Sequence, residues 1–176
     1  MLFTETPLAG AFVIELQRIA DERGFFARTF ETREFEARGL NPRVAQCSMS
    51  FNPRKGTLRG MHYQRAPFEE AKLVRCTRGA IHDVIIDLRP ASPAFRAHFA
   101  VVLDPESRRM LYVPEGFAHG FLTLDDDTEV AYQMSQSYSA EHAAGLRWND
   151  PAFGISWPGP VAVIADRDRT YPDFRE

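Results

Sequence analysis

Eight short runs of apolar, β-branched and aromatic residues constrain the fold of this chain more than any other feature. They span residues 11–16, 57–64, 71–76, 80–88, 98–103, 109–113, 118–124 and 129–134. Twelve prolines and eleven glycines are spread between the runs as turn signals. Such a series is typical of all-β sandwiches and barrels. The sequence therefore predicts a jelly roll or small barrel whose interior holds one ligand, although an up-and-down barrel would give a similar series.

Three local patterns add detail to this all-β prediction. A short helix is expected at residues 33–38, with Thr32 as its N-cap and Gly39 at its end. Thr77-Arg78-Gly79 is expected to form a tight turn that joins two strands. The segments Asp150-Pro151 and Trp157-Pro158-Gly159-Pro160 predict a coiled C-terminal segment.

Size and composition indicate one globular domain spanning residues 1–176, without repeats or linkers. The net charge is -3, so the chain lacks the excess of basic residues that is typical of nucleic-acid-binding proteins. No apolar run approaches about 18 residues and no signal peptide is recognised, so we expect a cytoplasmic protein without a membrane partner. Cys47 and Cys76 lie in separate segments of the chain; a disulfide between them is possible but unsupported, and we expect both to be buried free thiols.

Polar side chains at three strand positions share a face with apolar neighbours, because residues two apart in a strand point the same way. His62, Lys72 and Tyr132 are therefore expected to enter one cavity. Each also has an ordinary structural explanation: a satisfied histidine, a lysine that reaches solvent at the rim, and a tyrosine with its hydroxyl at the core edge. Simple alternation puts Arg59 on the face opposite His62, unless Gly60 marks a bulge or Arg59 reaches round the rim.

The histidines give no sign of a metal site. All five are scattered, without a His-x-His pair, at positions 62, 82, 98, 119 and 142. A zinc site needs three or four convergent ligands. Glycine-rich phosphate loops and Gly-x-Ser-x-Gly elbows are also missing from the sequence. We therefore expect no metal, and anion binding through arginines.

One nine-residue segment, Gly56-Thr-Leu-Arg-Gly-Met-His-Tyr-Gln64, closely resembles the signature of the dTDP-4-dehydrorhamnose 3,5-epimerase family. Further resemblances keep their order and spacing from about residue 21 to 168, in the segments 21–26, 72–76, 83–93, 114–121, 148–151 and 155–158. The resemblance implies a cupin-type jelly roll, usually a homodimer, that acts on a nucleotide-diphospho sugar without a metal or an organic cofactor.

The resemblance also implies roles for individual residues. His62 matches the catalytic base, Asp168 the aspartate paired with it, Tyr132 the proton donor, and Lys72 the lysine near the keto oxygen. The implied substrate-binding residues are Arg23, Phe26, Gln46, Ser48, Arg59, His119, Tyr138 and Arg167. In the family, the segment matching Arg23 reaches the site of the partner subunit, and the aromatic matching Tyr138 stacks on the nucleotide base.

These roles agree with the chemistry of a proton beside a ketone. The proton can be removed if a nearby cation stabilises the resulting enolate, and a histidine that titrates near neutral pH can accept it. The implied reaction is therefore inversion of C3, C5 or both carbons of a 4-keto-6-deoxy sugar, as in the conversion of dTDP-4-dehydro-6-deoxyglucose to dTDP-4-dehydrorhamnose.

Departures from the family pattern leave alternatives open. They are Cys47-Ser48-Met49 within the segment 46–50, one extra residue after it, Arg28, Ala143 and Arg167. One alternative is an epimerase of a CDP- or GDP-linked sugar, or of a single carbon. The other is a sugar-nucleotide-binding cupin without catalysis. Adjacent Phe25 and Phe26 indicate either a subunit interface or rings that cap their own barrel.

Overall fold

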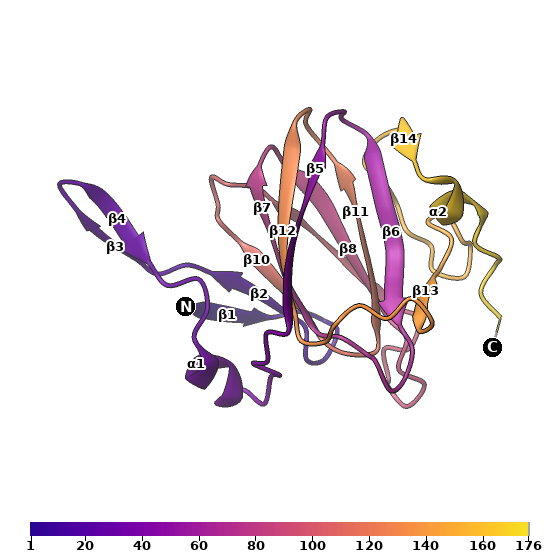
Figure 1. Ribbon diagram of the computed structural model, residues 1–176, viewed down its shortest axis with the longest axis horizontal. Helices are drawn as coiled ribbons and strands as arrows, with labels where there is room; N and C mark the ends of the chain where they lie inside the picture. Colours follow the sequence, from indigo (N-terminus) through magenta and orange to yellow (C-terminus); the bar gives the residue numbers. More distant parts are fainter. Residues whose placement is uncertain (176) are drawn as a thin grey trace.

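The computed structural model describes residues 1–175, which form two facing antiparallel sheets and a separate hairpin (Figure 1). The first sheet runs, in spatial order, β1 (Leu2–Glu5), β2 (Phe12–Glu15), β10 (Met110–Val113), β7 (Lys72–Arg78), β12 (Thr128–Met134) and β5 (Gln46–Asn52). The second runs β13 (Ala143–Gly145), β6 (Thr57–Gln64), β11 (Phe117–Thr123), β8 (Ile81–Asp87) and β9 (His98–Leu103). β14 (Val163–Ile164) pairs in parallel with β6.

The strand order confirms the jelly roll and excludes an up-and-down barrel, because most spatial neighbours are not consecutive in sequence. The segment Thr77-Arg78-Gly79 turns as predicted, with Gly79 at φ 71°, but it does not close a hairpin. The strands that it joins, β7 and β8, belong to opposite sheets. A side chain at residue 79 would collide with Thr128, so this crossing requires glycine.

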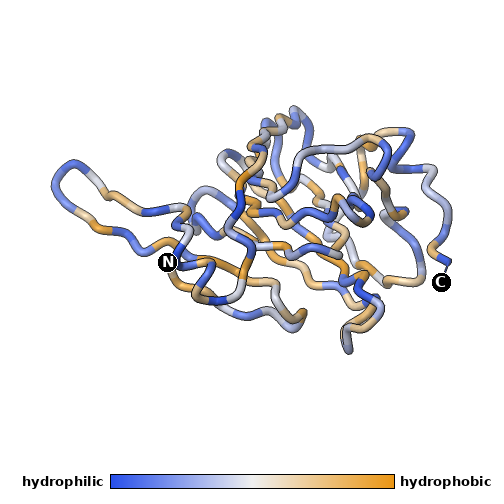
Figure 2. Tube along the Cα trace, turned by 60° about the horizontal axis from the view of Figure 1, so that its bottom comes forward, coloured by the Kyte–Doolittle hydropathy of each residue, from blue (hydrophilic) through white to orange (hydrophobic). Residues whose placement is uncertain are grey.

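Strand alternation builds the core between the sheets. Val74 and Cys76 of β7, Ile85 of β8 and Val130 of β12 are buried in one cluster that contacts both sheets. Figure 2 shows the hydrophobic segments along the central strands and the hydrophilic ones in most connecting loops. A second cluster, around Phe35, covers the outer face of the first sheet with helix α1 (Thr32–Glu36).

The helix cap differs from the prediction. Glu31, rather than Thr32, is the N-cap, because its carboxylate accepts a hydrogen bond from the Glu34 N–H at 3.0 Å. Gly39 ends the helical segment as predicted, with φ 68° and an N–H that donates to the Glu36 carbonyl. This positive φ is the conformation in which helices commonly end with glycine.

Several elements were not predicted: the strands β1, β5, β13 and β14, the hairpin of β3 (Arg18–Asp21) and β4 (Gly24–Ala27), and helix α2 (Asp166–Thr170). The coiled segment after β13 is confirmed, and Phe153 within it packs against Ile86 on the outer face of the second sheet. Cys47 and Cys76 are both free, but Cys47 is exposed rather than buried. No helix among residues 1–175 is long and apolar enough to span a membrane.

Candidate functional site

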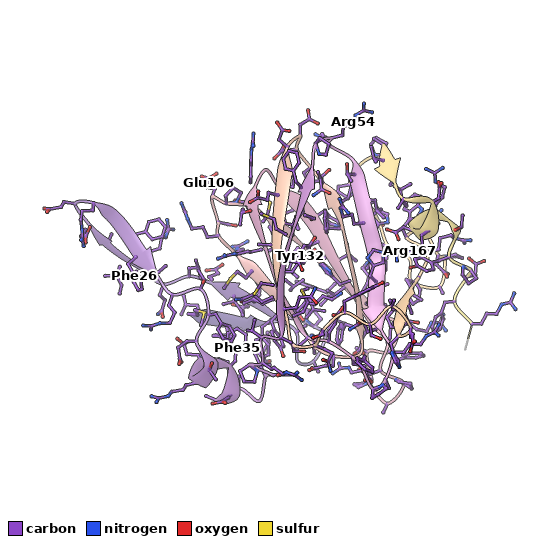
Figure 3. The ribbon with its side chains drawn as sticks, viewed as in Figure 1. Phe26, Phe35, Arg54, Glu106, Tyr132 and Arg167 are labelled. Atoms are coloured by element: carbon purple, nitrogen blue, oxygen red, sulfur yellow. The ribbon has the colours of Figure 1, made fainter. Side chains whose placement is uncertain are left out.

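A cavity of about 330 Å³ opens between the two sheets and collects most of the candidate residues. His62, Lys72 and Tyr132 all line it, so the prediction of one shared cavity is confirmed. Figure 3 shows Tyr132 between the sheets and Arg167 on the side of β6 and α2. The remaining candidates that line the cavity are Gln46, Ser48, Arg59, His119, Tyr138 and Arg167.

His62 on β6 is paired with Asp168 on α2. The His62 Nε2 atom lies 2.7 Å from Asp168 Oδ1, and the other carboxylate oxygen accepts from the Gly60 N–H at 3.1 Å. Burial opposes ionisation of Asp168, but the hydrogen bond and charge of His62, the Gly60 N–H and Arg167 outweigh it and hold the pKa of this carboxyl below its ordinary value. An ionised Asp168 thus orients the ring and leaves Nδ1, which residues 1–175 do not engage in a hydrogen bond, to act as a base.

The pairing of β14 with β6 brings Asp168 to this position across more than a hundred residues of sequence. Val163 lies opposite Thr57 in parallel register, and the Ala162 N–H donates to the Gly56 carbonyl at 2.8 Å. A side chain at Gly56 would approach the Pro160 carbonyl to 2.8 Å. The short helix α2 begins two residues after β14 ends, so this close backbone contact sets where Asp168 lies.

A bulge in β6 places Arg59 and His62 in the same cavity. His119 pairs with His62 and Phe121 with Arg59, so two steps along β11 match three along β6. Gly60 has φ 128°, and a Cβ there would meet Gly120 Cα at 2.5 Å. The glycine bulge considered from the sequence is therefore present, and alternation alone would have separated the two side chains.

Lys72 enters the cavity from β7, on the opposite sheet. Its Nζ lies 3.1 Å from Glu70 Oε1 and 3.4 Å from the His62 carbonyl. The Lys72 and Glu70 side chains are 10% and 13% exposed, so water screens their attraction weakly. The site therefore holds an ammonium group that is fixed between Glu70 and the backbone carbonyl of His62.

Tyr132 faces His62 across the cavity, because β12 belongs to the first sheet and β6 to the second. Its hydroxyl lies 3.0 Å from Ser50 Oγ. Burial raises the pKa of Tyr132 well above its ordinary value, against a lowering by Ser50. The phenol is therefore neutral near pH 7 and can donate a proton.

His119 lines the same wall as His62 and is held by a buried carboxylate. Its Nε2 lies 2.7 Å from Asp83 Oδ1, and its ring meets that of Tyr132 edge-on with centroids 6.3 Å apart. Asp83 is completely buried, and its second oxygen has no hydrogen-bond partner within residues 1–175. The pair fixes the orientation of the His119 ring in the cavity.

Polar and aromatic groups at the rim are partly exposed. Tyr138 is 60% exposed, and its N–H donates to Gln46 Oε1 at 3.1 Å. Arg167 Nη2 comes within 3.5 Å of His62 Nε2. The rim thus offers an aromatic face and a cation to a ligand.

The cavity residues that were not predicted as site residues include Ser50, Gln64, Glu70 and Tyr171. Gln64 shares a strand face with His62, so alternation could have found it. Ser50 follows Ser48 by two positions on β5, and alternation would have found it only if this strand had been predicted. Tyr171 follows α2, and its ring lies against Gly145, where a side chain would collide with it. No pattern in the sequence indicates that contact.

Arg23 and Phe26 lie away from the cavity of their own chain. They belong to the β3–β4 hairpin, which projects from the body of the molecule (Figures 1 and 3). Phe26 is 62% exposed, and Arg23 pairs only with nearby Asp21 among the described contacts, at 2.5 Å. Phe25 lies beneath the guanidinium groups of Arg18 and Arg108, so neither ring caps the barrel of this chain.

Within residues 1–175, no group of three or more histidine, cysteine, aspartate or glutamate side chains is placed to hold a metal ion. The cavity presents an imidazole–carboxylate pair on one wall and a lysine and a phenol on the facing wall. Such groups can remove and return protons beside a carbonyl group.

Comparison with known proteins assigns the family. The model of the dTDP-4-dehydrorhamnose 3,5-epimerase family matches residues 5–176. The epimerase of that name from Sinorhizobium fredii is 40% identical over 177 residues, covering 100% of this chain and 91% of its own. The one from Methanothermobacter thermautotrophicus is 42% identical, covering 99% of this chain and 95% of its own.

Solved structures agree in fold over nearly the whole chain. Bacillus anthracis dTDP-4-dehydrorhamnose 3,5-epimerase with TDP and PPi bound has a TM-score of 0.93 and 38% identity, covering 98% of this chain and 99% of its own. The Legionella pneumophila enzyme in complex with dTDP-4-keto-L-rhamnose has a TM-score of 0.88 and 34% identity, covering 95% and 89%.

A 3'-monoepimerase from Streptomyces bikiniensis in complex with dTDP-quinovose has a TM-score of 0.87 and 32% identity, covering 96% of this chain and 85% of its own. The fold is thus shared with an enzyme that is named for a different epimerisation. The family model and the curated relatives, by contrast, carry the name dTDP-4-dehydrorhamnose 3,5-epimerase. The chain belongs to the dTDP-4-dehydrorhamnose 3,5-epimerase family.

Proposed function

We propose that the chain inverts C3 and C5 of a dTDP-linked 4-keto-6-deoxy sugar, converting dTDP-4-dehydro-6-deoxyglucose to dTDP-4-dehydrorhamnose. The observation that carries the proposal is the position of His62 and Tyr132 on facing sheets around one cavity. Inversion requires that a proton leave one face of the sugar and that another arrive at the opposite face. A base and an acid on opposite walls meet that requirement without a turn of the sugar in the site.

The first step is proton removal by His62. Its Nδ1 takes the proton from the carbon beside the ketone, and Asp168 stabilises the imidazolium that forms, through the 2.7 Å contact at Nε2. The electrons of the broken C–H bond move into the enolate, whose oxygen becomes negative. Lys72 places its ammonium group in the same cavity and stabilises that charge.

The second step is protonation from the other wall. The Tyr132 hydroxyl gives its proton to the carbon on the opposite face, and the enolate returns to the ketone. Ser50, 3.0 Å from that hydroxyl, can support the phenolate before it takes a proton from solvent. The His62 imidazolium releases its proton to solvent, which restores the base. Because the same ketone activates both neighbouring carbons, the same groups can then act at each carbon in turn.

The arginines and the rim aromatic are proposed to hold the nucleotide part. Arg59 donates to the neutral Asn52 side chain at 2.7 Å, which leaves its positive charge for a diphosphate. Arg167 and Tyr138 lie at the exposed rim, where a base can stack on the phenol ring. Gln46, Ser48 and His119 complete the proposed contacts with the substrate.

Inversion of a single carbon is the second candidate, supported by the similarity to the Streptomyces bikiniensis 3'-monoepimerase. The experiment is incubation with dTDP-, CDP- and GDP-4-keto-6-deoxy sugars in deuterated water, followed by a count of deuterons at each carbon. The proposal expects exchange at C3 and C5 of the dTDP sugar, and no exchange with His62→Ala, which should still bind dTDP. Exchange at one carbon indicates a monoepimerase, preference for another nucleotide overturns the dTDP assignment, and binding without exchange indicates a non-catalytic cupin.

We also propose that the working unit is a homodimer in which Arg23 and Phe26 complete the partner's site. The projecting hairpin and its exposed Ile19, Phe25 and Phe26 support this arrangement, because subunit interfaces are enriched in aromatic residues and arginine. The test mixes an Arg23→Ala chain with a His62→Ala chain, each inactive alone. A composite site predicts recovered activity after subunit exchange. No recovery, with exchange confirmed by mass, contradicts the sharing of residues.

A further inference from the structure

Glu70 connects the proposed enolate-stabilising lysine to the frame of the cavity. One carboxylate oxygen lies 3.1 Å from Lys72 Nζ, and the other lies 3.3 Å from Gln64 Nε2. All three side chains line the cavity. Glu70 therefore forms an ion pair with Lys72 through one oxygen and accepts a hydrogen bond from Gln64 through the other.

Gln64 is itself held firmly at the end of β6. It is 5% exposed; its amide oxygen accepts from the Ser139 N–H at 2.6 Å, and its amide nitrogen reaches the Phe68 carbonyl at 2.9 Å. These contacts join the loop before β7 to the loop after β12. Glu70 is thus held by a side chain that has little freedom to move.

The donors of Lys72 can be counted against these acceptors. An ammonium group has three N–H donors, and its two partners are Glu70 Oε1, as an ion pair, and the His62 carbonyl, as a hydrogen-bond acceptor. The third donor remains for a ligand in the cavity that Lys72 lines. A lysine stem has several rotatable bonds, so without these acceptors the direction of that donor would be undefined.

We propose that Glu70 is a positioning residue that directs the Lys72 ammonium group at the keto oxygen of the substrate. The inference rests on the proposed function, in which Lys72 stabilises the enolate. In this role the Glu70 carboxylate acts through Lys72 and does not itself contact the reacting carbons. Fixing the cation before the reaction means that no reorganisation is needed as the negative charge forms.

Glu70→Gln tests this role with little change in shape. A carboxylate pairs its charge with Lys72 and accepts from Gln64 at the same time, whereas a neutral amide has one oxygen and would place its NH₂ group against one of these two side chains. The variant should lower kcat about 10- to 100-fold, since small misplacements of catalytic groups have effects of that size. KM should stay within about threefold, because the nucleotide contacts are untouched.

Glu69→Gln is the matched control, because it removes the same charge one residue away and Glu69 is not among the cavity-lining residues. It should keep the wild-type kcat, as measured by product formation and deuterium exchange at saturating dTDP sugar. Glu70→Asp keeps the charge but withdraws it by one methylene; it should have an intermediate kcat and carries the test if Glu70→Gln does not fold. In a Lys72→Met background, Glu70→Gln should change the residual exchange rate less than twofold.

Wild-type kcat in the folded Glu70 variants, or equal losses in Glu69→Gln and Glu70→Gln, would overturn the role of Glu70. An increase in KM with an unchanged kcat would overturn it as well. Failure of the proposed function is distinguishable, because then the wild-type protein itself exchanges no protons of the dTDP sugar.

Discussion

Asp168→Asn should disable His62 while leaving the shape of the site intact. The carboxylate accepts from His62 Nε2 and from the Gly60 N–H, at 2.7 and 3.1 Å. An asparagine can keep the Gly60 bond through its oxygen, but its NH₂ group then faces His62 Nε2. That donor stabilises the tautomer with the proton on Nδ1, so the nitrogen facing the substrate loses its basic lone pair.

The magnitude follows from the geometry of the pair. Asp168 is 3% exposed, and with charge centres about 4 Å apart the attraction between imidazolium and carboxylate is about 4 kcal/mol at an effective dielectric constant of 20. His62 is 33% exposed, so solvent reduces this value to roughly 3–4 kcal/mol. At 1.36 kcal/mol for each tenfold, the rate of proton removal should fall about 10²- to 10³-fold.

The assay is the exchange rate of substrate protons in deuterated water at saturating nucleotide sugar, with dTDP affinity measured in parallel. Exchange should fall by the stated factor, while the dissociation constant for dTDP changes less than about threefold. Exchange at the wild-type rate in a folded Asp168→Asn protein would refute the argument that the carboxylate sets the tautomer. Parallel loss of dTDP binding would instead mean that the site had collapsed.

The same variant tests the acid stability of the fold. The pKa of Asp168 in the folded protein lies below the ordinary value of 3.8, because the contacts with His62, Gly60 and Arg167 outweigh burial. Its ionised form therefore stabilises the fold above about pH 4, and that contribution is lost as pH falls through the lower folded value. The melting temperature of the wild type should decrease more steeply below pH 4 than that of Asp168→Asn, and parallel pH profiles would contradict this.

Three further substitutions test separate parts of the site. Tyr132→Phe should keep deuterium exchange within about threefold while the yield of epimerised product falls about tenfold or more, because only the donor is removed; equal losses would contradict its role. Arg59→Ala should raise KM about 10- to 100-fold and weaken its dependence on salt, whereas an unchanged KM would exclude a charge contact with the diphosphate. Gly145→Ala should lower stability by about 1–3 kcal/mol and reduce kcat, because the new Cβ collides with the Tyr171 ring; Gly159→Ala, where a Cβ would have no neighbour within 4 Å, is the control in thermal melts, and equal melting temperatures would contradict the clash.

Part of this structure follows from strand periodicity alone. The two-residue repeat placed His62, Lys72 and Tyr132 on inward faces, and the strand runs at 57–64 and 98–103 match β6 and β9 at both ends. Strand β5 was not predicted, because the prediction relied on apolar residues that face the core. Its inward residues include Ser48 and Ser50, while Met49 and Phe51 are 64% and 50% exposed, so its pattern of hydrophobicity is inverted.

The sequence by itself thus determined the all-β class, the inward faces of the regular strands and, through the signature at 56–64, the family. Tertiary structure decided the contacts that depend on backbone approach between distant segments. The bulge at Gly60 exists because Gly120 lies against it, and this contact brings Arg59 round to His62. Asp168 reaches His62 because a two-residue strand pairs in parallel with β6. Local periodicity carries no information about such contacts, since they depend on where the rest of the chain packs.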